Sequence, residues 1–361
     1  MHKKKKVYVG LSGGVDSATA AFLLQQKGYD VTGVYLKCWE GLQTDSGLQF
    51  NDSCSWRKER RDALAVAAML RIPFKTYDFV EEYQRAVVDN FFQEYAAGRT
   101  PNPDVLCNRI IKFDSFLKRA LYEGADAIAT GHYARVEQHQ SGAQLLAGVD
   151  STKDQSYFLW ALTQFALAHS FFPVGELKKA QVRKLALQIN LPNAQKPDSQ
   201  GICFIGKVPL ETFLQTRIPQ KDGKVITASG EVVGGHKGAA LYTIGQRHGL
   251  ALNAKLPYYV AGTDIENNVV TVAEGNSDKV LYRKMVRIEK EHWINESPKI
   301  GMKYSARIRY RQPLQKVECI AHEETGCRFR FTEPQRAVAP GQSLVVYDKD
   351  RVVGGGIIAA D

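Results

Sequence analysis

The 361-residue sequence predicts an α/β fold with a doubly wound parallel sheet, followed by a small Gly-rich middle domain and a C-terminal β-barrel. In the N-terminal part, short apolar runs alternate with segments of helical apolar spacing, and such repeated units build a parallel sheet covered on both faces. Glycine becomes dense after about residue 205, and from residue 281 short strands recur at the spacing of a small barrel. We therefore predict domains at 1–205, 206–278 and 279–361.

Apolar periodicity and turn residues predict the individual elements in order. The buried strands of the first domain are expected at residues 7–11, 31–36, 74–79 and 126–130. Its helices are expected at residues 17–27, 57–70, 80–97 and 107–123, with a hairpin over 133–149 and further helices over 155–190. A second hairpin is expected from strands 258–265 and 269–273, because Glu266-Asn267-Asn268 is a turn signal. The barrel strands are expected at residues 303–310, 315–322, 327–331, 343–347 and 352–358.

Composition excludes several classes of protein. Apolar residues make up 44% and charged residues 24%, which is ordinary for a soluble globular chain and unlike a disordered or fibrous one. No uncharged apolar run is long enough to span a membrane, and the basic start at Met1–Lys6 lacks the apolar core of a secretory leader. The six cysteines form no CxxC pair, which disfavours a zinc site of standard spacing. We expect a cytoplasmic protein with reduced cysteines.

The net charge of +10 is concentrated near the C-terminus. Residues 281–318 hold ten Lys or Arg against four Asp or Glu, and Lys303–Arg311 interleaves bases with aromatic residues. A solvated basic surface is one explanation of this pattern. The sharper interpretation is a polyanionic partner, since such mixing suits phosphate contacts and base stacking on a nucleic acid.

Residues 10–17, with the sequence GLSGGVDS, join the first strand to the first helix. Adjacent glycines let the backbone approach a phosphate, and the helix N-terminus points its N–H groups at the anion. Asp16 suits this position if it caps the helix or meets Mg²⁺. A generic strand-to-helix turn is the alternative, and the Walker ending is absent. The six residues SGGVDS resemble the PP-loop of the ATP-pyrophosphatase superfamily, which implies an adenine nucleotide alpha hydrolase-like fold, ATP and Mg²⁺.

Two cysteines lie in distinctive surroundings. Cys107 follows Pro101 and Pro103, so we expect it at or near a helix start, where the helix dipole lowers a thiol pKa while Asp104 raises it. Cys203 follows a polar loop at the end of the α/β part. Taken alone, each cysteine is better explained as a buried apolar filler. Cys38, Cys319 and Cys327 are expected to be core or strand residues.

Several further motifs occur in order along residues 7–358. They are NPDVLCN, TGHYAR, KDQSYFL, DSQGICFIG, YTIGQRHGL, ARIRYRQ and PGQ. Together they resemble the tRNA-uridine 2-sulfurtransferases, which thiolate the wobble uridine (position 34) of certain tRNAs. Leu11 and Leu36 stand where that family often has methionine, and residues 197–200 depart from its usual loop sequence.

The resemblance implies a mechanism. ATP adenylates uracil O2, sulfur attacks C2, and AMP and pyrophosphate are released. Cys203 would carry the persulfide, Cys107 would be the nucleophile, and the two would close into a disulfide during turnover. Asp104 would act as acid and base. The sulfur would come from a persulfide donor, either a cysteine desulfurase or a sulfur-relay protein.

The resemblance also implies binding residues. The ATP pocket would be formed by Gly10, Leu11, Ser12, Gly13, Gly14, Val15, Asp16, Ser17, Leu36 and Gly131. The tRNA would contact Asn102, Pro103, Asp104, His132, Lys153, Asp154, Gln155, Arg309, Tyr310 and Gln342. Without the resemblance, His132 is explained as a packed or capping histidine and Lys153 as a solvated surface charge. Arg309 and Tyr310 fit an alternating strand equally well.

Two other functions remain as alternatives at this point. A different PP-loop enzyme of tRNA, such as a cytidine-modifying ligase, needs neither cysteine. A non-catalytic RNA-binding module would use only the basic barrel. Cys54 falls where the family often has a cysteine, and we interpret it as structural, with an iron–sulfur role as the alternative.

Overall fold

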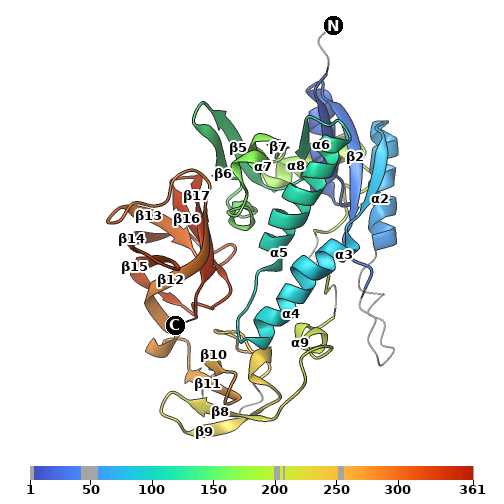
Figure 1. Cartoon of the computed structure of the whole chain (residues 1–361). Helices are drawn as coiled ribbons and strands as arrows, with labels where there is room; N and C mark the ends of the chain where they lie inside the picture. Colours follow the sequence, from blue (N-terminus) through green and yellow to red (C-terminus); the bar gives the residue numbers. More distant parts are fainter. Residues whose placement is uncertain (1–3, 42–55, 199–203, 206–207, 251–255, 361) are drawn as a thin grey trace.

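The computed structural model describes residues 4–41, 56–198, 204–205, 208–250 and 256–360 (Figure 1). The N-terminal part is built on a sheet in the order β3-β2-β1-β4-β7, in which all neighbouring strands are parallel. Its strands are β1 (Lys6–Gly10), β2 (Asp30–Lys37), β3 (Phe74–Asp78), β4 (Ala127–Ala129) and β7 (Ser170–Phe171). The predicted parallel sheet is confirmed.

Helices cover both faces of this sheet. Val7 and Val9 of β1 share one apolar core with α1 (Val15–Gln26), α2 (Trp56–Leu70) and α8 (Lys179–Gln188). Tyr8, between those two valines, faces the opposite core, which contains two long helices. The first consists of α3 (Val80–Tyr83), the π-helical η2 (Gln84–Val88) and α4 (Asp89–Ala96). The second consists of α5 (Pro103–Leu106), the π-helical η3 (Cys107–Ser115) and α6 (Phe116–Tyr122). The alternation along β1 is what makes the sheet doubly wound.

Two local expectations for this domain were wrong. The segment 155–190 is not simply helical. It holds the short helices η4 (Ser156–Phe158), α7 (Gln164–Ala168) and α8, and also strand β7, which is too short to show a periodicity. The helix that carries Cys107 begins four residues earlier, at Pro103, because proline is well accommodated at the first helical position.

The hairpin predicted over 133–149 is present as β5 (Ala134–His139) and β6 (Gly142–Ala147). It does not pair with the parallel sheet. β6 instead pairs with the last barrel strand, β17 (Arg351–Ile358), through Leu146 and Arg351. The N-terminal hairpin therefore extends the sheet of the C-terminal domain.

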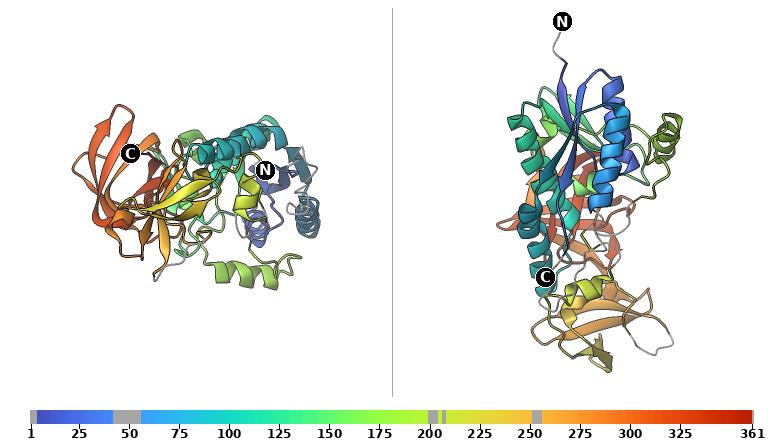
Figure 2. Two further views of the ribbon diagram at one scale, coloured as in Figure 1. Left: turned by 90° about the horizontal axis from the view of Figure 1, so that it is seen from below. Right: turned by 90° about the vertical axis from the view of Figure 1, so that its right-hand side faces the viewer.

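The middle domain is a small sheet in the order β10-β11-β8-β9. The predicted hairpin is confirmed as β10 (Tyr258–Asp264) and β11 (Val269–Glu274). The sequence analysis did not identify β8 (Gly223–Thr227) and β9 (Val232–His236), whose glycines weaken a strand pattern. Two short helices, α9 (Leu210–Leu214) and η5 (Ala239–Leu241), flank the sheet. Figure 2 shows this domain below the end of the long helix that contains α4.

The C-terminal domain is a closed barrel. Its strands run in the order β12-β15-β14-β13-β16-β17, and a β12–β17 pairing closes the ring. After η6 (Lys279–Leu281), the strands are β12 (Tyr282–Trp293), β13 (Lys303–Arg307), β14 (Gln315–Glu323), β15 (Gly326–Arg336), β16 (Ser343–Asp348) and β17. Closure leaves the sheet without a free edge along these strands.

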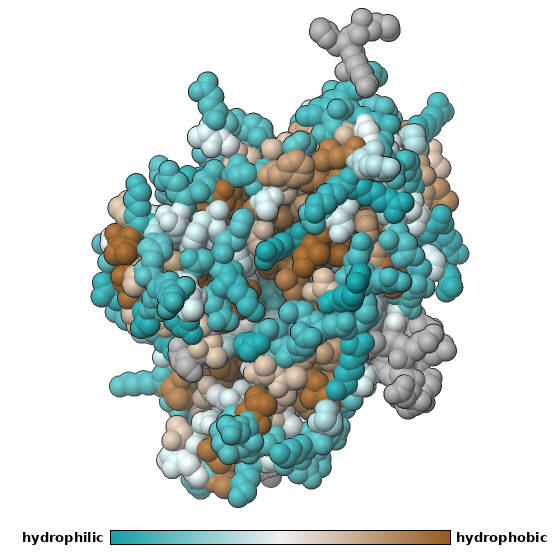
Figure 3. All heavy atoms as spheres, in the orientation of Figure 1, coloured by the Kyte–Doolittle hydropathy of each residue, from teal (hydrophilic) through white to brown (hydrophobic). Residues whose placement is uncertain are grey.

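The outer surface is largely hydrophilic on the face shown in Figure 3. Within the described ranges, no helix combines the length and apolar character needed to cross a bilayer.

Candidate active site

The predicted nucleotide pocket lies where the strand order of the parallel sheet reverses. β1 and β4 are neighbours, and the connections from them run to opposite sides of the sheet, which is the usual ligand crevice of such folds. Residues 10–17 run from the end of β1 into the start of α1, and Gly131 follows β4. A Cβ on Gly131 would lie 2.6 Å from the Ser17 nitrogen, so the two loops touch through their backbones. Leu36 stands near the end of β2 and is half-buried.

The loop after β1 is ordered by its own hydroxyl groups. The backbone N–H of Ser12 donates to Ser17 Oγ at 3.2 Å, and Ser17 Oγ donates to the Gly14 carbonyl at 3.0 Å. Gly13 has φ +73°, and a Cβ there would meet the Glu59 carbonyl of α2 at 2.6 Å. Leu11 and Val15 are 2% and 3% exposed and belong to the core under the loop, so only their main chains can face a nucleotide.

Basic side chains that the sequence analysis missed surround this loop. Lys179 Nζ lies 2.7 Å from Asp16 Oδ1, and the Tyr133 hydroxyl donates to the same oxygen at 2.8 Å. Lys196 Nζ donates to the Gly13 carbonyl at 3.2 Å and pairs with Asp62 at 2.6 Å. In the sequence these lysines look like solvated charges, and no motif distinguishes them.

Asp198 pairs with three cations, of which Lys179 is one. Its carboxylate lies 2.8 Å from Lys153, 2.8 Å from Lys179 and 2.6 Å from Arg183. Burial alone would raise the pKa of Asp198, but the hydrogen bonds from Lys153 and Lys179 bring it well below its ordinary value. Lys153 is thereby held against Asp198.

Asn102, Pro103, Asp104 and Cys107 lie together at the start of the second long helix. Asn102 is the N-cap residue, Pro103 is the first helical residue, and Asp104 follows in the first turn. Cys107 is one turn further along, three positions after Asp104, which places the two side chains on one face. Because the influence of the helix dipole falls off within the first turn, its effect on Cys107 is small.

Burial dominates the acid–base properties of this pair. It raises the pKa of the half-buried Cys107 thiol, with Asp104 adding to the increase and Lys112 opposing it. Burial also raises the pKa of Asp104, again opposed by Lys112. A carboxyl whose pKa lies closer to neutrality suits proton transfer.

Cys203 and Cys54 lie outside the described residues, so their predicted roles stay predictions. Phe204, directly after Cys203, is described and buried. Its ring packs against Phe91 of α4 at a centroid distance of 5.2 Å and against Trp39 at 5.9 Å. Cys107 packs against the same apolar core.

A barrel loop holds the segment that precedes Asn102. The Gln342 side-chain amide donates to the carbonyls of Thr100 at 2.9 Å and Pro101 at 3.1 Å. The Thr100 N–H donates to the Pro340 carbonyl at 2.8 Å. Gly341, with φ +89°, leaves no room for a side chain, since a Cβ would lie 2.9 Å from the Thr100 nitrogen. The PGQ motif is therefore a joint between the barrel and the loop leading to Cys107.

Arg309 and Tyr310 lie on the barrel side of the same junction. The Tyr310 ring packs on Phe158 at 4.5 Å between centroids, and the Phe158 carbonyl accepts a hydrogen bond from Asn108 at 3.1 Å. Arg309 donates to the Ala337 carbonyl. Ring packing and one hydrogen bond thus link Tyr310 to Asn108, the residue that follows Cys107.

The remaining predicted tRNA-binding residues are engaged within the protein. His132 is buried with Nδ1 2.7 Å from Thr130 Oγ1, and burial and Lys112 lower its pKa well below the ordinary value. Gln155 Oε1 accepts the Tyr133 N–H at 3.1 Å. Asp154 is buried and accepts the N–H groups of Gly148 and Ser156, each at 3.0 Å. Contact of these residues with tRNA stays a prediction.

Arg336, at the end of β15, is a further residue that the sequence did not single out. Its guanidinium lies over the Tyr259 ring at 4.6 Å, while its Nε and one terminal nitrogen are buried without a hydrogen-bond partner. Burial and the charge of Arg336 both lower the pKa of Arg309. Two guanidinium groups thus meet between the barrel and the middle domain.

Comparison with known proteins places this architecture in a family. Family models match residues 5–207 (tRNA methyl transferase HUP domain), 211–274 (tRNA methyl transferase PRC-barrel domain) and 283–358 (aminomethyltransferase beta-barrel domain). A tRNA-specific 2-thiouridylase from Nitrosomonas europaea is 46% identical over 98% of both chains. The same enzyme from Methylobacillus flagellatus is 43% identical over 99% of both.

Solved structures align less closely. The NMN synthetase of Francisella tularensis is 20% identical, with a TM-score of 0.34 over 55% of this chain and 67% of that chain. The full-length relatives, by contrast, match all three domains at once. On that evidence the chain belongs to the tRNA-specific 2-thiouridylase family.

Proposed function

We propose that this protein uses ATP to replace O2 of the wobble uridine in tRNA with sulfur. Its relatives are tRNA-specific 2-thiouridylases over nearly their whole length. The observation that carries the mechanism is the helix beginning at Pro103, which presents Asp104 and Cys107 one turn apart while a barrel loop holds its entry. An RNA bound to the barrel would therefore have a fixed position relative to Cys107, because a barrel loop is hydrogen-bonded to the segment before that helix.

The chemistry divides into three displacements. Uracil O2 attacks the α-phosphate of ATP in the crevice beyond β1 and β4, and pyrophosphate leaves. The terminal sulfur of a Cys203 persulfide then attacks C2, and AMP leaves with the former O2. Cys107, as thiolate, attacks Cys203 Sγ and expels the sulfur now bonded to C2, forming a Cys107–Cys203 disulfide. A dithiol reductant and a persulfide-carrying protein restore the enzyme.

Asp104 is positioned to take the proton from the Cys107 thiol. The raised pKa of Asp104 makes its carboxylate a stronger base for this transfer, whereas the raised pKa of the Cys107 thiol opposes it. A raised thiol pKa favours the protonated form of Cys107.

Mg²⁺ would arrive with the phosphates of ATP. The described residues do not form a magnesium site of their own, because both Asp16 oxygens are hydrogen-bonded to Lys179 Nζ, at 2.7 and 2.8 Å. Asp198 is likewise neutralised by three cations. We therefore assign no step to an ion held by the protein.

The test is formation of 2-thiouridine from unmodified tRNA, ATP, Mg²⁺ and a persulfide source, with RNA digestion and mass spectrometry. We expect Cys107→Ser and Cys203→Ser each to abolish the thionucleoside. Cys38→Ser is the matched control, since that half-buried thiol hydrogen-bonds to the Leu36 carbonyl. Thiolation that survives either of the first two substitutions contradicts the mechanism, and AMP release without a thionucleoside would favour another PP-loop reaction.

Gly131 tests the nucleotide pocket separately. A methyl group at this position would meet the backbone of Asp16 and Ser17, which cannot move aside as a side chain does. We expect Gly131→Ala to abolish tRNA-dependent AMP release. Gly262→Ala is the control, because a Cβ there would lie 3.9 Å from Thr271. Equal AMP release by both variants would argue against a nucleotide site at this crevice.

A further inference from the structure

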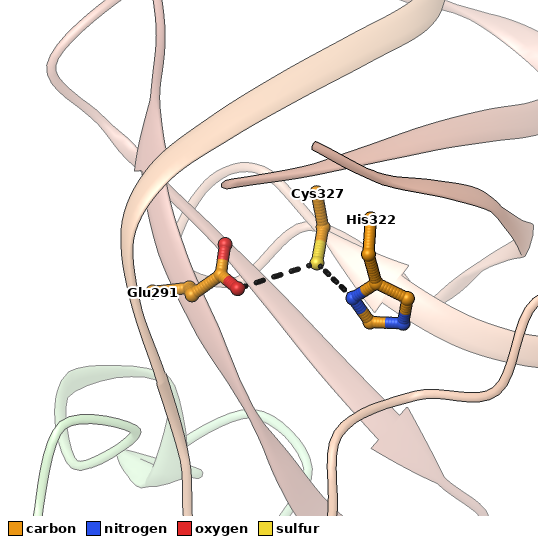
Figure 4. Close-up of side chains that lie close together, drawn as sticks. All are labelled: Glu291, His322 and Cys327. Atoms are coloured by element: carbon orange, nitrogen blue, oxygen red, sulfur yellow. Dashed lines mark hydrogen bonds between the residues drawn. The ribbon is translucent and has the colours of Figure 1, made fainter. Parts of the chain in front are cut away.

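Three potential metal ligands meet in the C-terminal barrel, on strands outside the site described above. Glu291 lies near the end of β12, His322 near the end of β14 and Cys327 near the start of β15. Figure 4 shows their side chains pointing toward one another. Their ligand atoms all lie within 4.8 Å of each other. In the part of the chain that the structure describes, this is the one such group of His, Cys and acidic residues.

The spacing approaches that of a tetrahedral metal site. Cys327 Sγ is 3.0 Å from His322 Nδ1 and 3.5 Å from Glu291 Oε1. With Zn–S and Zn–N bonds of about 2.3 and 2.0 Å, two ligands of one tetrahedral zinc ion lie roughly 3.5 Å apart. Both distances from Cys327 Sγ are within a few tenths of an ångström of that separation, and the His322 and Glu291 ligand atoms lie within 4.8 Å of each other.

The imidazole is held in the form that a metal requires. His322 Nε2 lies 2.8 Å from the Pro298 carbonyl, which can only accept a hydrogen bond, so Nε2 carries the proton. Nδ1, facing the thiol, then has a free lone pair. A backbone carbonyl that fixes the tautomer in this way is the usual companion of a metal-binding histidine.

Glu291 supplies the third ligand. Its Oε1 accepts from Trp293 Nε1 at 3.4 Å and lies 3.5 Å from Cys327 Sγ, whereas Oε2 is buried without a hydrogen-bond partner. An unsatisfied buried carboxylate oxygen is costly unless a cation or a donor meets it. His322 is exposed, which gives an ion a path from solvent.

We propose that Glu291, His322 and Cys327 form a binding site for a thiophilic divalent ion, with zinc as the best match. A thiolate, an imidazole and a carboxylate are ligands that zinc accepts, and the fourth position would be left to water. Binding displaces the Cys327 thiol proton to solvent and forms the metal–sulfur bond. The site has no CxxC spacing, so the sequence pattern does not reveal it.

Such an ion would be structural. It would tie β12 to the hairpin formed by β14 and β15, across the bulge in β12 that lies between Glu289 and His292. Cys319 is a neighbour rather than a ligand, because its Sγ lies 4.0 Å from His322 Nε2, the nitrogen bonded to Pro298.

The experiment uses the full chain with Cys107→Ser and Cys203→Ser, so that the active-site thiols bind no metal. This parent is titrated with Co²⁺, and the near-ultraviolet band of a thiolate–cobalt bond is recorded. We expect the band in the parent, its loss in Cys327→Ala, and a large loss of cobalt affinity in His322→Gln. Cys319→Ala is the matched control and should keep the band.

Zinc binding is measured on the same proteins after gel filtration. The parent is expected to retain a single zinc ion and to melt at a higher temperature with zinc, and His322→Gln is expected to lose both properties. Because the His322 side chain is exposed, this variant should fold even if Cys327→Ala does not. A parent without retained zinc or a cobalt band, or a band that survives both ligand substitutions, would overturn the proposal.

Discussion

Arg307 of the barrel forms a buried ion pair with Asp154 of the N-terminal domain. The guanidinium nitrogen lies 3.3 Å from Asp154 Oδ2, and the two side chains are 9% and 2% exposed. The same Asp154 carboxylate accepts two backbone N–H groups through Oδ1. This buried ion pair therefore links the barrel to the segment that carries Lys153 and Gln155.

Arg307→Met should destabilise the protein strongly. It leaves the Asp154 carboxylate buried without its counter-charge, which costs about 3–5 kcal/mol. The measurement is the free energy of unfolding in urea. Arg330→Met is the control, because the pair of Arg330 with Glu318 is 52% and 28% exposed and such pairs contribute less than about 1 kcal/mol. Equal losses of unfolding free energy in the two variants would show that burial of the Arg307–Asp154 pair does not contribute to stability.

Gln342→Leu should slow thiolation without unfolding the chain. It removes the hydrogen bonds to Thr100 and Pro101, of about 1 kcal/mol each, that hold the entry to the Cys107 helix. If half or more of that energy positions Cys107 in the transition state, the rate falls roughly tenfold. Gln315→Leu, which removes a similar bond to Pro313 on the barrel surface, should leave the rate unchanged. A normal thiolation rate in Gln342→Leu would mean that the hydrogen bonds from Gln342 to Thr100 and Pro101 do not position Cys107.

The pH at which Cys107 is half alkylated should shift in opposite directions in Asp104→Asn and Lys112→Met. Burial raises the pKa of the thiol most, Lys112 lowers it and Asp104 raises it. The thiolate forms above the pKa, so Asp104→Asn should move the midpoint of iodoacetamide labelling to lower pH and Lys112→Met to higher pH. Peptide mass spectrometry at Cys107 measures both. Asp114→Asn, an exposed carboxylate paired with Lys118 on the same helix, should leave the midpoint in place.

Arg336→Met should weaken tRNA binding. The Arg336 and Arg309 guanidinium groups repel each other, and a phosphate between them would relieve that repulsion. Loss of one phosphate contact lowers the slope of log K against log salt by about 0.7–0.9. Filter binding at several salt concentrations tests this, with Arg328→Met as control because Arg328 pairs with Glu323 at 2.6 Å. Parallel salt slopes for Arg336→Met and the unchanged protein would remove Arg336 from the RNA surface.

Apolar periodicity was sufficient to predict a strand or helix where that element has one consistently buried face. The alternation in β1 and the hairpin of β10 and β11 were predicted for that reason. It failed for β7, which has only two residues, and for β12, whose Arg283, Lys284 and Arg287 disguise the pattern. Tertiary pairing, rather than local preference, determines both strands.

The candidate site was predictable where residues form a local motif. The loop of residues 10–17 and the Asn102–Cys107 helix start are each contiguous in sequence. Lys179 and Lys196 escaped notice because they reach Asp16 and Gly13 from distant parts of the chain. The separations are 163 and 183 positions, over which a single sequence gives no pairing signal.

The hairpin β5–β6 has a consequence for synthesis of the protein. Its partner strand β17 lies at the far end of the chain, and the bond from Arg135 to Asp350 joins residues 215 positions apart. At about 5–20 residues per second, a ribosome needs tens of seconds to cover that distance. Throughout that interval the nascent N-terminal domain carries an unpaired strand edge. We therefore expect a chaperone to bind this edge during translation and to dissociate once β17 has emerged from the ribosome.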